Sequence, residues 1–219
     1  VPVSLALMLP GFILGNLLGI ALGLSAARRR GQWIDRVIGG LSVTGMSISF
    51  LVIIILLQLL LSTPYGLNLF PVRGWQVVDL PSYLAYVTVP SISLILVTLG
   101  YNTRFYRAVF VEESGKDHIT TARAYGVPPA VIMWKHVLKN SMVPIITRFM
   151  FSIPLVVISG SLLIETYFGI PGVGKVTFDA ITSGDQPVLK AVVGLTAVAF
   201  VLIQLATDLF YRLVDPRIA

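Results

Sequence analysis

Five long apolar stretches dominate the chain, and each is long enough to cross a bilayer. A hydrocarbon core of about 30 Å is spanned by about 20 apolar residues in a helix. The stretches are about 5–27, 40–61, 84–111, 143–164 and 188–214. None of them alternates polar and apolar residues in the manner of a membrane β-barrel strand. The pattern therefore predicts an all-α fold, a polytopic membrane helical bundle with five visible spans in a single domain over 1–219.

Two of these expected spans carry interruptions. Asn102, Arg104 and Arg107 break the apolar run of the third stretch, so its embedded part is expected to end near Tyr101. The fourth contains two prolines, which a membrane helix tolerates when neighbouring helices bind the freed carbonyl groups. We still expect each of these stretches to form one helix.

Basic residues gather in alternate loops. Thirteen of the 16 Lys and Arg residues lie in 28–36, 104–148 and 212–217. Because cytoplasmic loops carry the excess of Lys and Arg, this side is predicted to be cytoplasmic and loops 62–82 and 165–187 to lie outside. The net charge of +6 follows from this asymmetry, so the expected partner is the lipid bilayer and no nucleic acid.

Composition excludes several other classes of protein. Charged residues make up 12% of the chain, about half the share of a soluble domain. The absence of cysteine excludes disulfide scaffolds and thiol catalysis. His118 and His136 lack the spacing of metal ligands, so we expect no metal site and no catalytic residue. Within the last span, Asp208 and Arg212 lie four residues apart and are expected to form a local ion pair.

The start of the chain suggests a preceding segment. The first residue is Val1, and no basic region precedes the first apolar stretch, so no signal peptide is visible. Five spans with a cytoplasmic C-terminus place the N-terminus outside. We therefore expect an upstream segment that contains another helix.

The first span carries a row of small residues. Gly11, Gly15, Gly19 and Gly23 recur every four residues, so they lie on one face of a helix. Such a row lets a second membrane helix approach closely. We expect it to be a helix-packing face.

The loop 165–187 is dense in Gly and Pro, so we expect turns that can dip partly into the membrane. Its Gly169, Gly174 and Lys175 satisfy most of a phosphate-binding loop pattern. However, Val176 stands where that loop needs a hydroxyl, and the segment follows a membrane helix instead of a buried strand. Nucleotide binding is therefore not expected here.

The cytoplasmic loop, about 102–142, is predicted to hold two short helices. Residues 119–125 can form two helical turns that Gly126 ends, and Pro129 can open a second helix that runs to about Lys139. The pair is either a solvated connector or a docking element. Exposed apolar side chains favour docking; those expected to be exposed are Tyr125, Val127, Ile132 and Trp134.

Three separated motifs resemble one transporter family. The stretch 120–138 resembles the EAA loop of ABC importer permeases, with matches at Ala122, Gly126 and Leu138, in the form used by dipeptide, oligopeptide and nickel permeases. The stretch 162–188 is similar to a second motif of that family. The C-terminal residues Asp208, Tyr211 and Asp215–Arg217 are similar to a third motif of that family. The form of the motif with Asn140 preceded by Lys139 is closer to that of the first of the two paired permeases in this family.

The resemblance implies an architecture, partners and sites. It implies a type I ABC importer transmembrane domain in the bacterial inner membrane, with six helices, paired with a second permease, two cytoplasmic ATPases that bind ATP and Mg²⁺, and an extracytoplasmic solute-binding protein. No cofactor is expected in this chain. The implied ATPase-coupling residues are Ile119, Thr120, Thr121, Ala122, Arg123, Ala124, Tyr125 and Gly126. The implied outer-loop residues are Glu165, Pro171, Gly172, Gly174, Asp185 and Pro187.

Together these observations predict the permease subunit of an ATP-driven, binding-protein-dependent importer. It would form half of the path for peptides or a similar small solute by alternating access. A channel or an ion-coupled carrier that works without ATP is the alternative. No chain of carboxylates of the kind that proton-driven carriers use lies in the spans, which favours the importer.

Overall fold

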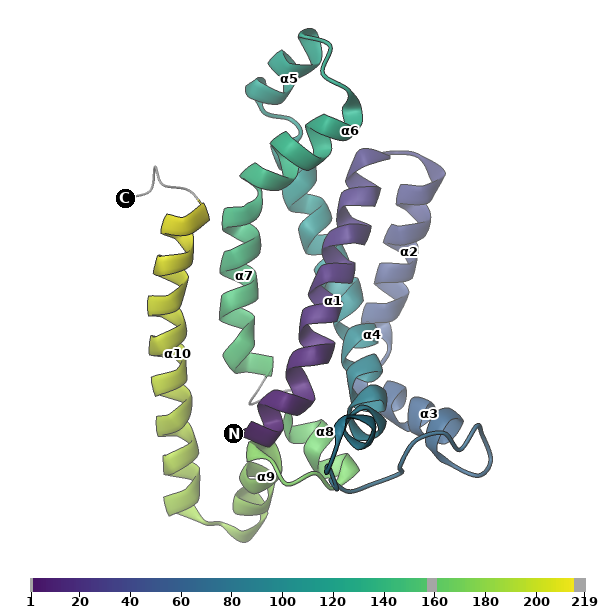
Figure 1. Cartoon of the computed structure of the whole chain (residues 1–219), viewed down its shortest axis with the longest axis vertical. Coiled ribbons are helices and arrows are strands. Elements are labelled where there is room, and N and C mark those ends of the chain that lie inside the picture. Colours follow the sequence, from purple (N-terminus) through teal and green to yellow (C-terminus); the bar gives the residue numbers. More distant parts are fainter. Residues whose placement is uncertain (1, 157–160, 215–219) are drawn as a thin grey trace. The chain divides into compact units, whose positions relative to one another are not determined.

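The computed structural model describes residues 2–156 and 161–214, and within these ranges every regular element is a helix. The prediction of an all-α fold is therefore confirmed. In chain order the helices are α1 (Pro2–Arg28), α2 (Trp33–Ser47), α3 (Phe50–Ser62), α4 (Leu80–Glu113), α5 (Asp117–Ala124), α6 (Pro129–Val131), the π-helix η1 (Ile132–Leu138), α7 (Met142–Leu155), α8 (Ser161–Phe168), α9 (Val173–Ser183) and α10 (Gln186–Val214). Figure 1 labels most of them.

Three of the expected spans form single helices in the described chain. α1, α4 and α10 are long and apolar enough to cross a membrane. α4 runs without a break through Asn102, Arg104 and Arg107 to Glu113, so the charged residues near its end do not end the helix. Long Arg side chains can extend toward the membrane surface from such a position.

The second expected span is built from two helices, α2 and α3, which are apolar enough to form a span together. α2 ends at Ser47, and α3 begins at Phe50. Ser49 has extended backbone angles at the start of α3, and the Ser47 hydroxyl donates to the Val43 carbonyl at 2.9 Å. A hydrogen bond from a serine hydroxyl to the carbonyl four residues earlier often bends a helix. The average hydropathy of a stretch of residues does not reveal such a bond. The helical stretch also begins earlier than expected, at Trp33.

Other predictions fall partly outside the described residues. The fourth expected span contains α7 and the start of α8, and residues 157–160 between them lie outside the described chain. The expected partner of Asp208, the side chain of Arg212, lies outside it as well. So do Val1 and the C-terminal motif Asp215–Arg217.

Contacts divide the chain into two units. Unit 1 holds the described residues of 1–14, 48–97 and 151–205, and unit 2 those of 15–47, 98–150 and 206–219. In unit 1, Tyr83 donates from its hydroxyl to the Ala6 carbonyl at 2.7 Å, and the Gly74 N–H donates to the Phe168 carbonyl at 2.8 Å. These bonds tie α4 to α1 and the 62–82 loop to α8.

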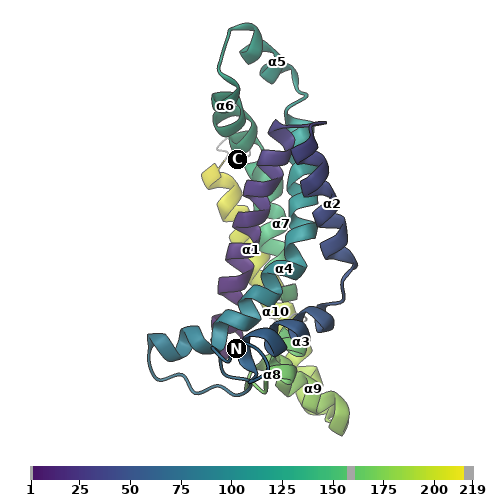
Figure 2. The ribbon, with the colours of Figure 1, turned by 90° about the vertical axis from the view of Figure 1, so that its right-hand side faces the viewer.

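In unit 2, α5 and η1 rest on a buried apolar cluster. Its members come from α1, α4, α5, η1 and α7: Leu24, Ala27, Tyr106, Phe110, Ile119, Ile132, Met133, Val137 and Ile145. Two polar contacts brace the helices beside it. Tyr106 donates from its hydroxyl to Asn16 at 2.5 Å, and Arg107 donates to both carboxylate oxygens of Asp35 at 2.5 and 2.7 Å. Figures 1 and 2 show α5 and α6 beyond the ends of α1 and α4.

Candidate functional site

Helix α5 begins and ends where the local sequence requires. Asp117 lies in its first turn, where a carboxylate interacts favourably with the free N–H groups. At the other end the Gly126 N–H donates to the Arg123 carbonyl at 3.0 Å, and the Val127 N–H donates to the Ala122 carbonyl at 3.1 Å. Gly126 adopts a φ of 76°, the left-handed conformation that commonly ends helices and that suits glycine. The prediction of a short helix ended by Gly126 is confirmed.

The second helix starts as predicted but differs in kind. Pro129 occupies the first turn of α6, where its missing N–H costs nothing. After three residues the helix widens into the π-helix η1, which runs from Ile132 to Leu138. A π-helix places successive side chains at a different angle from an α-helix.

The structure corrects the expected exposure of two of the four docking residues. Ile132 is 3% exposed and belongs to the buried cluster, and Val127 packs against the same cluster. Ile132 is therefore not available for a partner, and Val127 is only partly exposed. Tyr125 and Trp134 are 84% and 64% exposed, so these two large side chains remain uncovered.

The α5 residues divide into an inward and an outward set. Ile119 is fully buried in the cluster, and Ala122 packs against it. The remaining residues of the expected coupling segment are exposed: Thr120, Thr121, Arg123, Ala124, Tyr125 and Gly126. The helix is thus seated by one large side chain and presents most of its surface outward.

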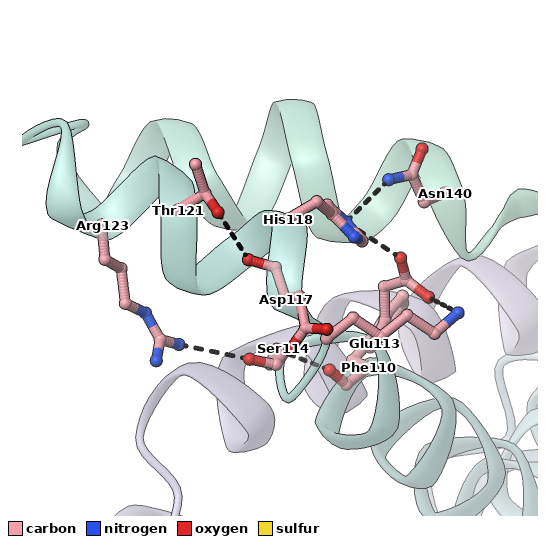
Figure 3. A network of polar contacts seen from close by, with 9 residues as sticks. Phe110, Glu113, Ser114, Asp117, His118, Thr121, Arg123 and Asn140 are labelled. Carbon is pink, nitrogen blue, oxygen red and sulfur yellow. Dashed lines mark hydrogen bonds and ion pairs between the residues drawn. The ribbon is translucent and has the colours of Figure 1, made fainter.

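A polar cluster lies where α4 meets α5, and Figure 3 shows it. One carboxylate oxygen of Glu113 is 2.6 Å from Lys116 Nζ, and the other is 3.3 Å from Nε2 of His118. The Asn140 amide, which follows η1, is 3.0 Å from the same Nε2. The sequence shows only that His118 lacks the spacing of a metal ligand, and the cluster is not visible in it because the tight turn between α4 and α5 brings these residues together.

The Glu113 carboxylate also changes the titration of its neighbour. The hydrogen bond to Glu113 raises the pKa of Lys116 above its ordinary value. A raised lysine pKa means that the contact is present below the ordinary lysine value and is lost only as the pH rises through the higher value. The Glu113–Lys116 pair is therefore formed throughout the neutral range.

An open cavity lies beside α5. It has a volume of about 580 Å³ and is lined by residues from the end of α1, the end of α4 and the α5–η1 segment, including Arg28, Arg30, Val111, Arg123 and Val127. Arg123 reaches only to the Ser114 carbonyl, at 3.5 Å. On this side α5 therefore has little packing.

The expected packing row lies against α4 within each unit. A Cβ atom at Gly11 would lie 2.9 Å from Ser91 Cα in unit 1. In unit 2, a Cβ atom at Gly19 would lie 2.6 Å from Asn102 Cβ, and one at Gly23 would lie 2.9 Å from the Arg107 backbone nitrogen. Gly15, on the same row, is buried. α1 and α4 approach so closely at these positions that no larger side chain fits.

The segment 165–187 has turns at Gly169 and Gly184, as expected, but between them lies a helix that its Gly and Pro content did not predict. α8 continues beyond the expected end of the fourth span to Phe168, and α9 occupies Val173–Ser183. Glu165 is fully buried, and its carboxylate accepts a hydrogen bond from the Lys175 N–H at 3.1 Å. A carboxylate at a helix N-terminus neutralises the free N–H groups there, which is why this Gly-rich segment starts a helix.

The other expected outer-loop residues surround that carboxylate or begin the next helix. A Cβ atom at Gly172 would overlap the Glu165 carboxyl group, and one at Gly174 would overlap the Leu162 backbone. Pro171 is exposed beside them. Asp185 caps α10 by accepting from the Val188 N–H at 3.2 Å, and Pro187 lies in the first turn of that helix. The Lys175 N–H that a phosphate-binding loop would offer is thus directed to Glu165.

Comparison with known proteins identifies the chain at the level of its family. The family of inner membrane components of binding-protein-dependent transport systems matches residues 19–219. The chain belongs to this family. It is therefore the inner membrane component of a transport system that depends on a binding protein, and it crosses the membrane several times.

Individual relatives of this inner membrane component agree with the family. The dipeptide transport system permease protein DppB of Lactococcus lactis subsp. cremoris is 36% identical over 217 residues, which are 99% of this chain and 69% of the relative. The glutathione transport system permease protein GsiC of Salmonella typhimurium is 33% identical over 216 residues, 98% of this chain and 67% of the relative. Both are permease subunits.

A solved structure supports the same fold. A chain of the MetNI methionine ABC transporter, in an inward-facing conformation, aligns with a TM-score of 0.68 over 96% of this chain and 94% of that chain. The two sequences are 18% identical, so the likeness concerns the fold alone. The expected ABC importer transmembrane fold is confirmed.

Proposed function

We propose that the chain is one of two paired permeases in an ATP-driven importer of peptides or a similar small solute. Two cytoplasmic ATPases and an extracytoplasmic binding protein complete the assembly. The names of its relatives support this substrate class, since they include permeases for dipeptides and for glutathione. ATP and Mg²⁺ are bound by the ATPases, and this chain performs no covalent chemistry.

Helix α5 with Gly126 is proposed to be the docking element for an ATPase. The observation that carries this is the outward surface of α5 and η1, where Tyr125 and Trp134 are largely exposed. A connector that only links two spans has no use for two exposed aromatic side chains. An aromatic anchor in a protein interface contributes strongly to binding, so these residues suit a partner surface.

The proposed mechanism is alternating access. Closure of the two ATPases on ATP moves α5, and because Ile119 is embedded in the cluster of unit 2, the movement reaches the ends of α1, α4 and α7. These helices then open the path outward to the binding protein. Release of the hydrolysis products reverses the movement and opens the path to the cytoplasm.

Reconstitution tests this proposal against its rival. The purified chain alone, the two permeases together, and the full assembly with ATPases and binding protein are placed in vesicles and supplied with a labelled dipeptide. We expect uptake and substrate-stimulated ATP hydrolysis only with the full assembly. Uptake by the chain alone, without ATP, would favour the channel or carrier and contradict the importer.

The proposed orientation has its own test. Tyr65, 94% exposed in the 62–82 loop, and Gln32, exposed in the first basic loop, are replaced singly by Cys in a chain that has no other Cys. A membrane-impermeant thiol reagent added outside intact cells should label Tyr65→Cys and spare Gln32→Cys. The reverse labelling pattern would overturn the orientation.

A further inference from the structure

Glu113 is the point at which one membrane helix is fastened to the outward-facing helix α5. It is the last residue of α4 and is 5% exposed, and only Ser114, Gly115 and Lys116 separate it from α5. We propose that Glu113 is a positioning residue that locks the orientation of α5 on α4, so that movement of α5 is passed to the membrane helices. The proposal rests on the proposed function of α5 and extends it to a residue outside the family motif.

The carboxylate binds both sides of the start of α5. Its two oxygens contact Lys116, which immediately precedes the helix, and His118, which lies in its first turn. Figure 3 shows His118, from the first turn of α5, directed toward Glu113. Ionised partners make hydrogen bonds about twice as strong as neutral ones. Two such contacts on neighbouring positions restrain both the position and the rotation of the helix.

Without this clamp the attachment of α5 would rest mainly on Ile119, with Ala122 partly buried against the same cluster. An eight-residue helix is too short to be stable by itself, so tertiary contacts must hold it. Ile119 is the one fully buried residue of α5, and a single buried side chain acts as a pivot. The side of α5 that carries Arg123 faces an open cavity and is not packed against another helix in the described chain. The contacts of Glu113 with Lys116 and His118 add a second attachment, so that α5 cannot rotate about Ile119 and is rigidly connected to α4.

Asn140 joins a third element to the clamp. The His118 Nε2 atom faces both the Glu113 carboxylate and the Asn140 amide. This nitrogen carries either one hydrogen or one lone pair, and the carboxylate is an acceptor only. Asn140 Nδ2 lies 3.0 Å from this atom and the Glu113 carboxylate 3.3 Å, so Nε2 accepts from Asn140 in one tautomer and donates to Glu113 in the other. The connection after η1 is thereby held to α4 and α5.

The test compares two adjacent carboxylates in the full transporter. Glu113→Gln keeps the size of the side chain and removes its charge, and Glu112→Gln makes the same change on an exposed neighbour. Amide hydrogen exchange over residues 117–126 is measured in both assemblies, together with substrate uptake and ATP hydrolysis. We expect Glu113→Gln to speed exchange and to lower uptake per ATP hydrolysed about tenfold, within the usual range of coupling between two sites. Glu112→Gln should match the wild type.

The outcomes separate the clamp from the proposed function. Unchanged exchange in Glu113→Gln would overturn the clamp and leave the docking role of α5 untouched. Faster exchange with normal uptake per ATP would show that the clamp is only structural and would overturn the positioning role. If Glu113→Gln fails to assemble, Lys116→Met combined with His118→Leu removes the same contacts from two exposed positions and should give the same loss.

Discussion

Replacing Gly126 with valine is expected to abolish transport while leaving the chain inserted in the membrane. The reason is conformational. Gly126 has a φ of 76°, and no atom lies within 4 Å of the position that a Cβ would take. A side chain would therefore meet no obstacle, but the left-handed conformation costs a residue other than glycine about 1–2 kcal/mol, and a β-branched residue more. The turn must open, and the end of α5 is directed elsewhere.

Ala124→Asp tests the same surface without strain. Ala124 is the last residue of α5 and is exposed, so the chain itself tolerates a charge there. In a docking groove a buried, unpaired carboxylate is costly. Uptake in vesicles should fall below about a tenth of the wild-type rate, the change that ~1.4 kcal/mol produces, and co-purification of the ATPase should weaken.

Two control variants isolate the docking role. Gly31 also has a positive φ, 79°, with open space around it, in the other basic loop, so Gly31→Val imposes the same strain away from α5. Ala124→Ser keeps the side chain small. Both should transport normally. Wild-type uptake in Gly126→Val and Ala124→Asp would instead favour a solvated connector and remove the main reason for assigning α5 to an ATPase.

The ends of the short helices could be predicted from the sequence, because single residues determine them. Gly126 and Pro129 each act through their own backbone, so the end of α5 and the start of α6 were visible in the sequence. The same holds for α1, α4 and α10, whose length and apolar composition set their extent. The break between α2 and α3 was missed because hydropathy does not record a hydroxyl that bonds to its own helix.

The features that were missed depend on tertiary contacts. Glu113 and His118 are five residues apart, and only the turn between α4 and α5 brings them together. Ile132 is buried by residues of α1, α4, α5 and α7 in the cluster of unit 2, which no residue pattern in its own segment indicates. Glu165 folds back onto the N-terminus of α9, so a segment with the composition of a loop becomes a helix.

Replacing glycines of the α1 row with larger residues is expected to prevent assembly of the transporter. The loss should be as large as that of Gly126→Val, which instead affects coupling. In unit 2 a Cβ at Gly19 would lie 2.6 Å from Asn102 Cβ, and one at Gly23 would lie 2.9 Å from a backbone nitrogen of α4. Backbone atoms of a packed helix cannot move aside as the end of a flexible side chain can. Overpacking of this kind costs typically about 1–3 kcal/mol and sometimes more. Gly19→Leu and Gly23→Leu should therefore separate α1 from α4.

The measurement is the yield of assembled transporter and its thermal unfolding in detergent. Gly40→Leu is the matched control, because Gly40 is an exposed helical glycine in α2 with no atom near its Cβ position. We expect Gly40→Leu to assemble normally and both α1 variants to lose assembly. Since close approach of backbones, and not apolar burial, holds membrane helices together, the smaller change Gly19→Ala should already lower the unfolding temperature. Normal assembly of Gly19→Leu and Gly23→Leu would mean that α1 and α4 are not packed through this row in the membrane.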